Sequence, residues 1–200
     1  AGYQGGDIVI PSEHKGLPVT KIGYGAFKSE KKLTSVVIPD SVTFIGTAAF
    51  SNCSLSNVEL PALLVTIQEK AFSHNETFDV IEIPSSVRTI GADIFVQSVV
   101  NKFISHIPAE NLNAIDEEAF NWNVSLYVPY GAKETYESTD GWKNFVEIIE
   151  MEDTQSHLAQ SISLDYESFT LAPENTILLT ATVLPETAEN KSVTWTSSND

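Results

Sequence analysis

The stretch that decides the fold is Leu33-Thr34-Ser35-Val36-Val37-Ile38-Pro39-Asp40-Ser41-Val42-Thr43-Phe44-Ile45-Gly46-Thr47-Ala48-Ala49-Phe50. It joins a β-like run that ends in proline to an isoleucine that precedes a phenylalanine by five positions. Both signatures recur along the chain. The runs end at Pro11, Pro39, Pro61, Pro84, Pro108 and Pro129, and the pairs are Ile22/Phe27, Ile45/Phe50, Ile67/Phe72, Ile90/Phe95 and Ile115/Phe120.

The constant phase of the two signatures indicates a repeat protein. Successive phenylalanines lie 23, 22, 23 and 25 residues apart, while the Ile-to-Phe spacing never changes. Alternation before each proline points residues such as Val36 and Ile38 inward, and the proline ends the strand because it has no N–H donor. Since stacked coils bury an apolar edge that one coil cannot bury alone, we expect a β-rich leucine-rich-repeat solenoid. About five coils, from residue 1 to about 128, would form a short arc.

The stretch after Pro129 predicts the end of the solenoid. Residues 130–136 favour a short helix, and Trp142, Phe145, Ile148 and Ile149 then supply large apolar groups. An open solenoid end needs a cover, so we expect a C-terminal aromatic and helical cap at about 130–150 and a domain that spans 1–150. The alternative is an aromatic ligand platform around Trp122, Tyr136 and Trp142. The polar residues 151–160 are interpreted as a linker.

A different pattern follows the linker. Residues 161–164, 176–183 and 192–196 are β-branched runs separated by turn residues, which predicts a partial all-β sandwich over 161–200. Sandwich domains of this kind have roughly 100 residues, and half a sandwich exposes an unpaired edge. Either the domain is cut short in this chain, or this piece self-associates with a neighbouring molecule.

Two family resemblances are carried by these residues. The pattern Leu33-x-x-Val36-x-Ile38-Pro39-x-Ser41-Val42-x-x-Ile45-Gly46-x-x-Ala49-Phe50-x-x-Cys53 resembles the BspA-like leucine-rich repeat of bacterial surface proteins, over about 145 residues. Leu179-x-Ala181-x-Val183-x-Pro185 and Asn190-Lys191-x-Val193-x-Trp195 resemble the first half of a bacterial immunoglobulin-like domain of group two. The resemblance implies an extracellular, cell-surface, adhesin-like binder of host or matrix proteins. Asp93, Ile94 and Asp116 depart from the repeat pattern, so irregular coils are expected near 93–106.

The charge balance excludes some partners. Lys and Arg total 11 against 27 Asp and Glu, a formal net charge of -16. A nucleic-acid binder needs a basic footprint, and an anionic membrane surface attracts basic segments, so neither partner is expected. No apolar run approaches the roughly 18 residues of a membrane span. The chain begins Ala1-Gly2-Tyr3 without Met, so we expect a processed product whose targeting segment is not in this sequence.

No catalytic constellation is found, and we expect a protein that is not an enzyme and has no cofactor or metal. Cys53 is the single cysteine, so it forms no intramolecular disulfide. A thiol nucleophile is conceivable there, but its place three residues after Phe50 favours a buried structural residue. Glu59 and Glu82 occupy equivalent positions in neighbouring coils, roughly 5 Å apart by strand spacing. An acid/base pair is the functional interpretation of these carboxylates, and a solvated sheet face is the simpler one.

The outward strand positions are the candidate binding residues. By register they lie two or four residues before each proline, and they mix apolar with acidic side chains, which suits protein recognition. We select Val9, Val37, Glu59, Val80, Glu82, Ile104, His106 and Tyr127. The sequence predicts a non-catalytic binding module that recognises an extracellular protein or glycan through this face. The alternative is a structural stalk or accessory region of a larger surface protein, with no ligand of its own.

Overall fold

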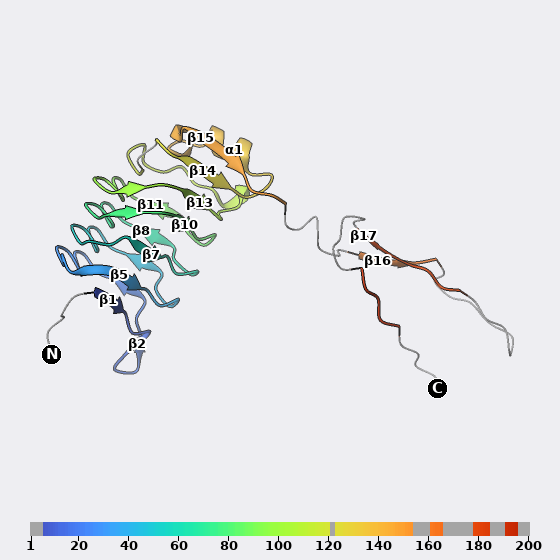
Figure 1. Ribbon diagram of the computed structural model, residues 1–200, viewed down its shortest axis with the longest axis horizontal. Coiled ribbons are helices and arrows are strands. Elements are labelled where there is room, and N and C mark those ends of the chain that lie inside the picture. The colour runs from blue at the N-terminus through green and yellow to red at the C-terminus, as the bar shows by residue number, and fades with distance from the viewer. Residues whose placement is uncertain (1–5, 121–122, 154–160, 166–177, 185–190, 196–200) are drawn as a thin grey trace. The chain divides into compact units, whose positions relative to one another are not determined.

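The computed structural model of the chain describes residues 6–120, 123–153, 161–165, 178–184 and 191–195. The chain divides into two compact units, Ala1–Met151 and Glu152–Asp200. The first unit is a stack of coils, and the colour in Figure 1 advances from one coil to the next. Of the linker predicted at 151–160, residues 154–160 lie outside the described residues.

One wall of the first unit consists of parallel strands, with one strand from each coil. They form a three-stranded sheet in the order β1-β5-β7 and a four-stranded sheet in the order β10-β13-β14-β15. The strands are β1 Gly6–Val9, β5 Leu33–Val37, β7 Asn57–Glu59, β10 Ile81–Ile83, β13 Phe103–Ser105, β14 Ser125–Val128 and β15 Glu147–Glu150. Alternation buries Val36, Val58 and Ile81, as predicted.

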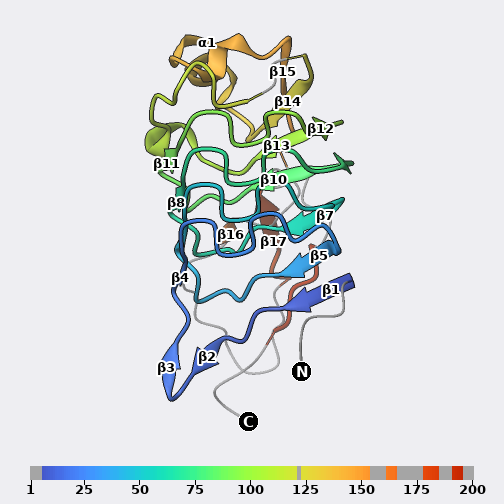
Figure 2. The same cartoon turned by 90° about the vertical axis from the view of Figure 1, so that its left-hand side faces the viewer.

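The opposite wall is built from two-residue strands that contain the repeated isoleucines. These are β4 Lys21–Ile22, β6 Phe44–Ile45, β8 Thr66–Ile67 and β11 Thr89–Ile90, paired in parallel in the order β11-β8-β6-β4. Figure 2 shows the two walls on opposite sides of the coils. A Cβ at Gly91, directly after this wall, would lie 2.5 Å from the Glu69 backbone nitrogen. Glycine is therefore required there by the close approach of two coils.

The first four of the repeated phenylalanines form a continuous stack between the walls, whereas the Phe120 ring packs against Phe103 and the cap. The rings of Phe27, Phe50, Phe72 and Phe95 lie nearly parallel, with successive centroids 5.1, 5.4 and 5.5 Å apart. The coil turns sharply on both sides of each ring. Residues two before and two after the ring have left-handed φ: Gly25, Ser29, Ala48, Asn52, Lys70, His74, Asp93 and Gln97. Gly25 is the one glycine among these eight residues. The other seven adopt a left-handed conformation that costs a non-glycine residue about 1 kcal/mol or more.

A series of side-chain hydrogen bonds, called the ladder below, joins neighbouring coils at the position three residues after each repeated phenylalanine. The Cys53 thiol donates to the Phe27 carbonyl at 3.0 Å, and the Asn75 amide donates to the Phe50 carbonyl at 2.9 Å. The Ser98 hydroxyl donates to the Phe72 carbonyl at 3.0 Å. Three different side chains therefore bond to the equivalent phenylalanine carbonyl of the preceding coil, in keeping with the need of buried and half-buried backbone groups for a partner.

The coils become irregular where the sequence departs from the repeat. An additional parallel pair forms between β9 Thr77–Phe78 and β12 Val99–Val100. The 3-10 helix η1 Ala109–Asn111 follows β13. At the other end of the unit, β2 Glu13–His14 and β3 Leu17–Pro18 form a short antiparallel hairpin.

The aromatic residues after Pro129 cover the last coil, which confirms the predicted cap. Helix α1 Lys133–Ser138 and the 3-10 helix η2 Trp142–Asn144 precede β15. Tyr136, Trp142 and Phe145 are buried. The Tyr136 hydroxyl donates to the Ile107 carbonyl at 2.8 Å, and the Trp142 indole donates to the Asn113 carbonyl at 3.0 Å. The alternative of an aromatic ligand platform is therefore wrong for Tyr136 and Trp142, because their rings fill the core; Trp122 lies outside the described residues.

In the second unit, β16 Ser161–Leu164 pairs with β17 Ala181–Leu184 in an antiparallel arrangement. The strand predicted at 161–164 is confirmed. The strand predicted at 176–183 is shifted, because Leu178–Thr180 lie outside a strand. The strand predicted at 192–196 is wrong for Ser192–Trp195, with which no strand of the described residues forms a ladder. Across the described ranges, no helix is long and apolar enough to span a membrane.

Candidate functional site

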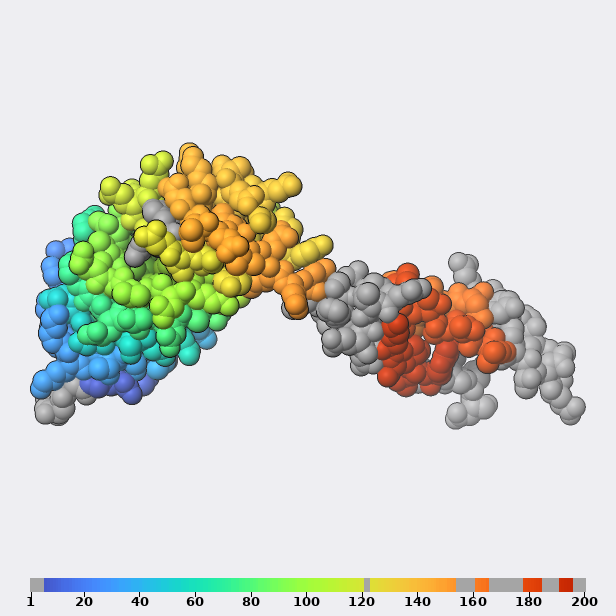
Figure 3. Space-filling view, turned by 45° about the horizontal axis from the view of Figure 1, so that its top comes forward, coloured from blue at the N-terminus to red at the C-terminus, as the bar shows by residue number. Residues whose placement is uncertain are grey.

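The predicted outward residues lie on the outer surface of the strand wall. Val9 is 72% exposed and Val37 is 54% exposed, and the register pairs them with each other across β1 and β5. Glu59 continues the row on β7. Figure 3 shows the surface of successive coils as adjacent bands of colour. These residues therefore belong to one continuous outer row.

The register places Ile104, and not His106, in the same row as Glu82. Glu82 pairs with Ile104, and Ile104 pairs with Tyr127. Alignment by proline had placed His106 in this row, which is wrong, because the coil has two extra residues before Pro108. His106 lies two residues after Ile104, just beyond the end of β13, and remains exposed. It is close enough for its Nε2 to contact Glu82 Oε2 at 2.9 Å.

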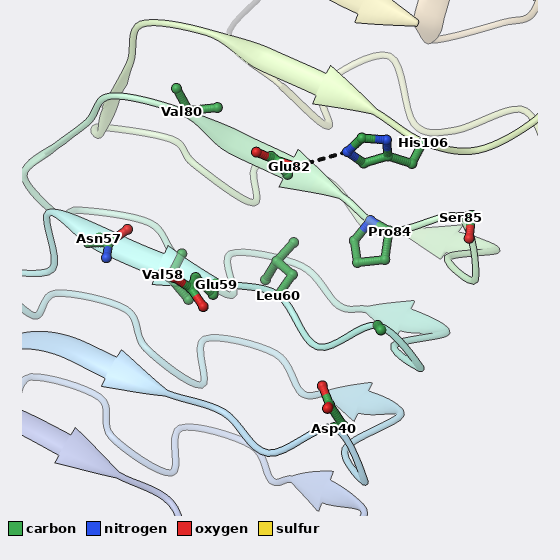
Figure 4. Close-up of a pocket in the computed structure, with 11 residues that line it drawn as sticks. Asp40, Asn57, Val58, Glu59, Leu60, Val80, Glu82, Pro84, Ser85 and His106 are labelled. Atoms are coloured by element: carbon green, nitrogen blue, oxygen red, sulfur yellow. Dashed lines mark hydrogen bonds and ion pairs between the residues drawn. The ribbon is translucent and has the colours of Figure 1, made fainter. Parts of the chain in front are cut away.

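The strand wall is interrupted between β7 and β10. Strand β7 is the edge of one sheet and β10 the edge of the other, and within the described ranges no backbone hydrogen bond joins them. The expectation that Glu59 and Glu82 face each other across a regular ladder is therefore wrong. Their strands separate at this point, as Figure 4 shows. A sheet that is continuous on both sides thus has one break in its middle.

The break leaves backbone groups of both strands without a ladder partner. Ile81 donates to the Lys102 carbonyl, and the Ile83 carbonyl accepts from His106, so both residues direct their backbone groups toward β13. Because successive residues of a strand point their N–H and C=O in opposite directions, the groups of Glu82 face β7. By the same alternation, the backbone N–H and C=O of Val58 point toward β10, since those of its neighbours on β7 bond to β5.

A cleft of about 670 Å³ lies at this break. Its lining residues come from four successive coils and are shown in Figure 4. They are Asp40, Asn57, Val58, Glu59, Leu60, Ala62, Val80, Glu82, Pro84, Ser85 and His106. The volume falls within the range of about 300–1,000 Å³ typical of ligand sites. The structure thus brings together four of the eight predicted residues: Glu59, Val80, Glu82 and His106.

The other four predicted residues lie away from the cleft. Val9 and Val37 are on the first sheet, and Ile104 and Tyr127 are on the second. The Lys102 ammonium lies 3.9 Å from the centre of the Tyr127 ring. Tyr127 is thus already engaged by a cation–π contact.

The sequence interpretation missed several cleft residues. Asp40, Ala62 and Ser85 each follow the proline of a coil directly, and all three line the cleft. That common position was a usable signal. Leu60 lies two residues after Val58 and therefore on the same inward side, yet it is only partly buried.

A larger core residue distinguishes the coil on one side of the break. Phe78 stands where Leu55 stands in the preceding coil and Val100 in the following one. Its ring is fully buried and meets the Phe95 ring edge-on, with centroids 5.6 Å apart. The same position is Leu33 one coil earlier. The break therefore coincides with the bulkiest residue at this position of the repeat.

Comparison with known proteins identifies both units. The sequence profile of the "BspA type Leucine rich repeat region" matches residues 7–127 in six copies. The chain belongs to the BspA-type leucine-rich repeat family. The profile of the "Bacterial Ig-like domain (group 2)" matches residues 158–200. The six copies exceed the about five coils that were expected from the Ile–Phe pairs, so that expectation was one coil too few.

A solved leucine-rich repeat protein is similar to this BspA-type chain. It is the T. pallidum leucine-rich repeat protein TpLRR, with 23% sequence identity and a TM-score of 0.45. The match covers 74% of this chain and 71% of TpLRR. No curated protein matches the chain significantly.

The two family matches suggest a binding or structural module of a surface protein. BspA-type repeats and group 2 immunoglobulin-like domains are typical of bacterial surface proteins and are typically non-catalytic. Cys53 is buried, and desolvation raises the pKa of its thiol above the ordinary value, which disfavours the reactive thiolate. Among the residues that the structure describes, no three or more His, Cys, Asp or Glu side chains cluster as metal ligands would.

Proposed function

We propose that this chain is a non-catalytic, adhesin-like binding module of a secreted or surface-displayed bacterial protein. It recognises an extracellular protein or glycan through the outward face of the strand wall. The observation that carries this proposal is the cleft at the break between β7 and β10. A purely structural solenoid would gain from continuous pairing, since each broken ladder leaves buried or half-buried backbone groups unsatisfied.

The composition of the cleft supports recognition of a specific ligand. Val58, Leu60 and Val80 supply apolar surface, and Glu59, Glu82 and Asn57 supply polar groups at its rim. Ligand sites commonly combine an apolar lining with a few placed polar groups. The exposed apolar residue Val37 extends this surface along the first sheet.

Binding to immobilised laminin, collagen and fibronectin tests the proposal against the alternative of a stalk with no ligand. The test variant combines V37S, E59Q, E82Q and Y127S on the strand wall. The matched control changes the same residue classes elsewhere, with L63S, E110Q, E134Q and Y24S. We expect the test variant to lose binding at an unchanged melting temperature and the control to retain it. If the two variants bind equally, the strand wall is not the recognition face and the stalk interpretation is favoured.

We also propose that the immunoglobulin-like unit self-associates. Ile162, Leu164 and Trp195 are 55%, 48% and 52% exposed, which leaves apolar surface uncovered. Light scattering of the 21.9 kDa chain over increasing concentration measures this directly. A mass that stays monomeric at the highest concentration contradicts self-association.

A further inference from the structure

The geometry of the cleft points to a class of partner: we propose that it accepts the guanidinium side chain of an arginine on the bound protein. This inference rests on the proposed binding function and specifies its central contact. The arginine would enter between β7 and β10, with its head group beside Glu59 and Glu82 and its stem along the apolar lining.

The charge of the cleft favours a cationic occupant. Its lining contains three carboxylates, those of Asp40, Glu59 and Glu82, and none of its lining residues is Lys or Arg. The chain as a whole carries a net charge of -16. Complementary charge guides association and selects the partner. An anionic ligand would be repelled by the carboxylates of the cleft and by the net negative charge of the chain.

The hydrogen-bonding groups favour arginine among cations. A guanidinium has five N–H donors in a planar arrangement and no acceptor. The cleft offers carboxylate oxygens on both sides, together with the backbone carbonyls of Val58 and Glu82, which have no ladder partner. Donors fixed in one plane can therefore bond to both strand edges at once, which a single ammonium point charge does less well.

The apolar lining matches the aliphatic part of the same side chain. Val58, Leu60 and Val80 lie beside the acidic rim. Arginine buries its methylene stem against apolar surface while its charged end stays with polar groups. The cleft thus combines the two environments that one arginine needs.

His106 is the resident partner that an arginine would displace. Its Nε2 lies 2.9 Å from Glu82 Oε2, and the two side chains are 44% and 62% exposed. Exposed ion pairs of this kind contribute little, so the contact does not block the cleft. Among the described residues, Glu59 on the facing strand takes part in no ion pair.

A pair of matched peptides tests the inference on the whole chain. The first is an acetylated, amidated heptapeptide of alternating Thr and Val with a central Arg, and the second has citrulline in place of Arg. Citrulline keeps the shape and removes the charge. Amide chemical shifts of Val58, Glu59 and Glu82 report binding. We expect a dissociation constant of about 1 mM for the Arg peptide and about tenfold weaker binding of the citrulline peptide.

Two double variants locate the effect. E59Q/E82Q removes two charges from the cleft, whereas E134Q/E137Q removes two from α1 in the cap. We expect the first to weaken Arg-peptide binding about tenfold and the second to leave it unchanged. Equal affinity for the two peptides, equal loss in the two variants, or no shift at β7 and β10 up to about 10 mM peptide would overturn the inference. If matrix binding is still lost only in the strand-wall variant, the proposed function stands without the arginine contact.

Discussion

The ladder at Asn75 leads to a quantitative prediction about stability. The Asn75 amide donates to the carbonyls of Phe50 and Phe72, each at 2.9 Å, and its Oδ1 accepts from the backbone N–H of Leu55 at 3.0 Å. The Phe72 carbonyl also accepts from Ser98. N75A therefore leaves two groups without their partner, the Phe50 carbonyl and the Leu55 N–H. Both residues are fully buried.

The expected cost follows from those two groups. A buried group that loses its hydrogen-bond partner costs about 1–3 kcal/mol, so N75A should lower the free energy of unfolding by about 3 kcal/mol. With a urea slope of about 2 kcal/mol per M, the midpoint falls by about 1.5 M. Circular dichroism of the strand signal in a urea titration measures this midpoint.

Two further variants make this prediction refutable. N101A removes an exposed amide that contacts Asp79 Oδ1 at 3.3 Å, and it should cost under about 0.5 kcal/mol. N75S should recover part of the loss, because Ser98 fills the same position and bonds the equivalent carbonyl. If N75A and N101A shift the midpoint equally, or if N75S is no better than N75A, the ladder is not what holds neighbouring coils together.

Three other predictions concern the cap, the turns and the break. Y136F should lower stability by about 1–2 kcal/mol. Burial raises the pKa of the Tyr136 phenol, despite its hydrogen bond with Ser105, so the native state keeps this proton to higher pH than the unfolded chain. This stabilisation is present below the pKa of about 10 of the unfolded chain and is lost as the pH rises above it. In urea titrations at alkaline pH, the free energy of unfolding should therefore fall less steeply with pH in Y136F than in the unmodified chain. An equally steep fall contradicts this. Gln97 is exposed with a φ of 58°, so Q97G should raise the free energy of unfolding by about 0.5–1 kcal/mol, while Q97A should not. If calorimetry finds the two variants equally stable, the backbone of residue 97 is not strained. We attribute the break to Phe78, so F78L should allow β7 and β10 to pair and slow amide exchange at Glu82 by about tenfold; unchanged exchange would show another cause.

Much of the fold follows from local spacing in the sequence. The constant five-residue interval places Ile45 and Phe50 in the core, and the rings of Phe27, Phe72 and Phe95 continue the stack that contains Phe50. Proline positions mark strand ends because the missing N–H acts within one coil. The cap was predictable for a similar reason, since Trp142 and Phe145 are large apolar groups placed where an open end must be covered.

The site depended on contacts between coils, which no single repeat specifies. Alignment by proline placed His106 one step wrong, because two extra residues shift the register of a coil without changing which face is outward. The position three after each ring holds Cys53, Asn75 or Ser98, and only the stacked coils reveal their shared carbonyl partner. The alternation of Glu59 and Glu82 was visible in the sequence, but whether their strands pair is decided by packing across the interface of two coils. Side-chain direction is thus a local property of the chain, whereas the break that forms the cleft is a tertiary one.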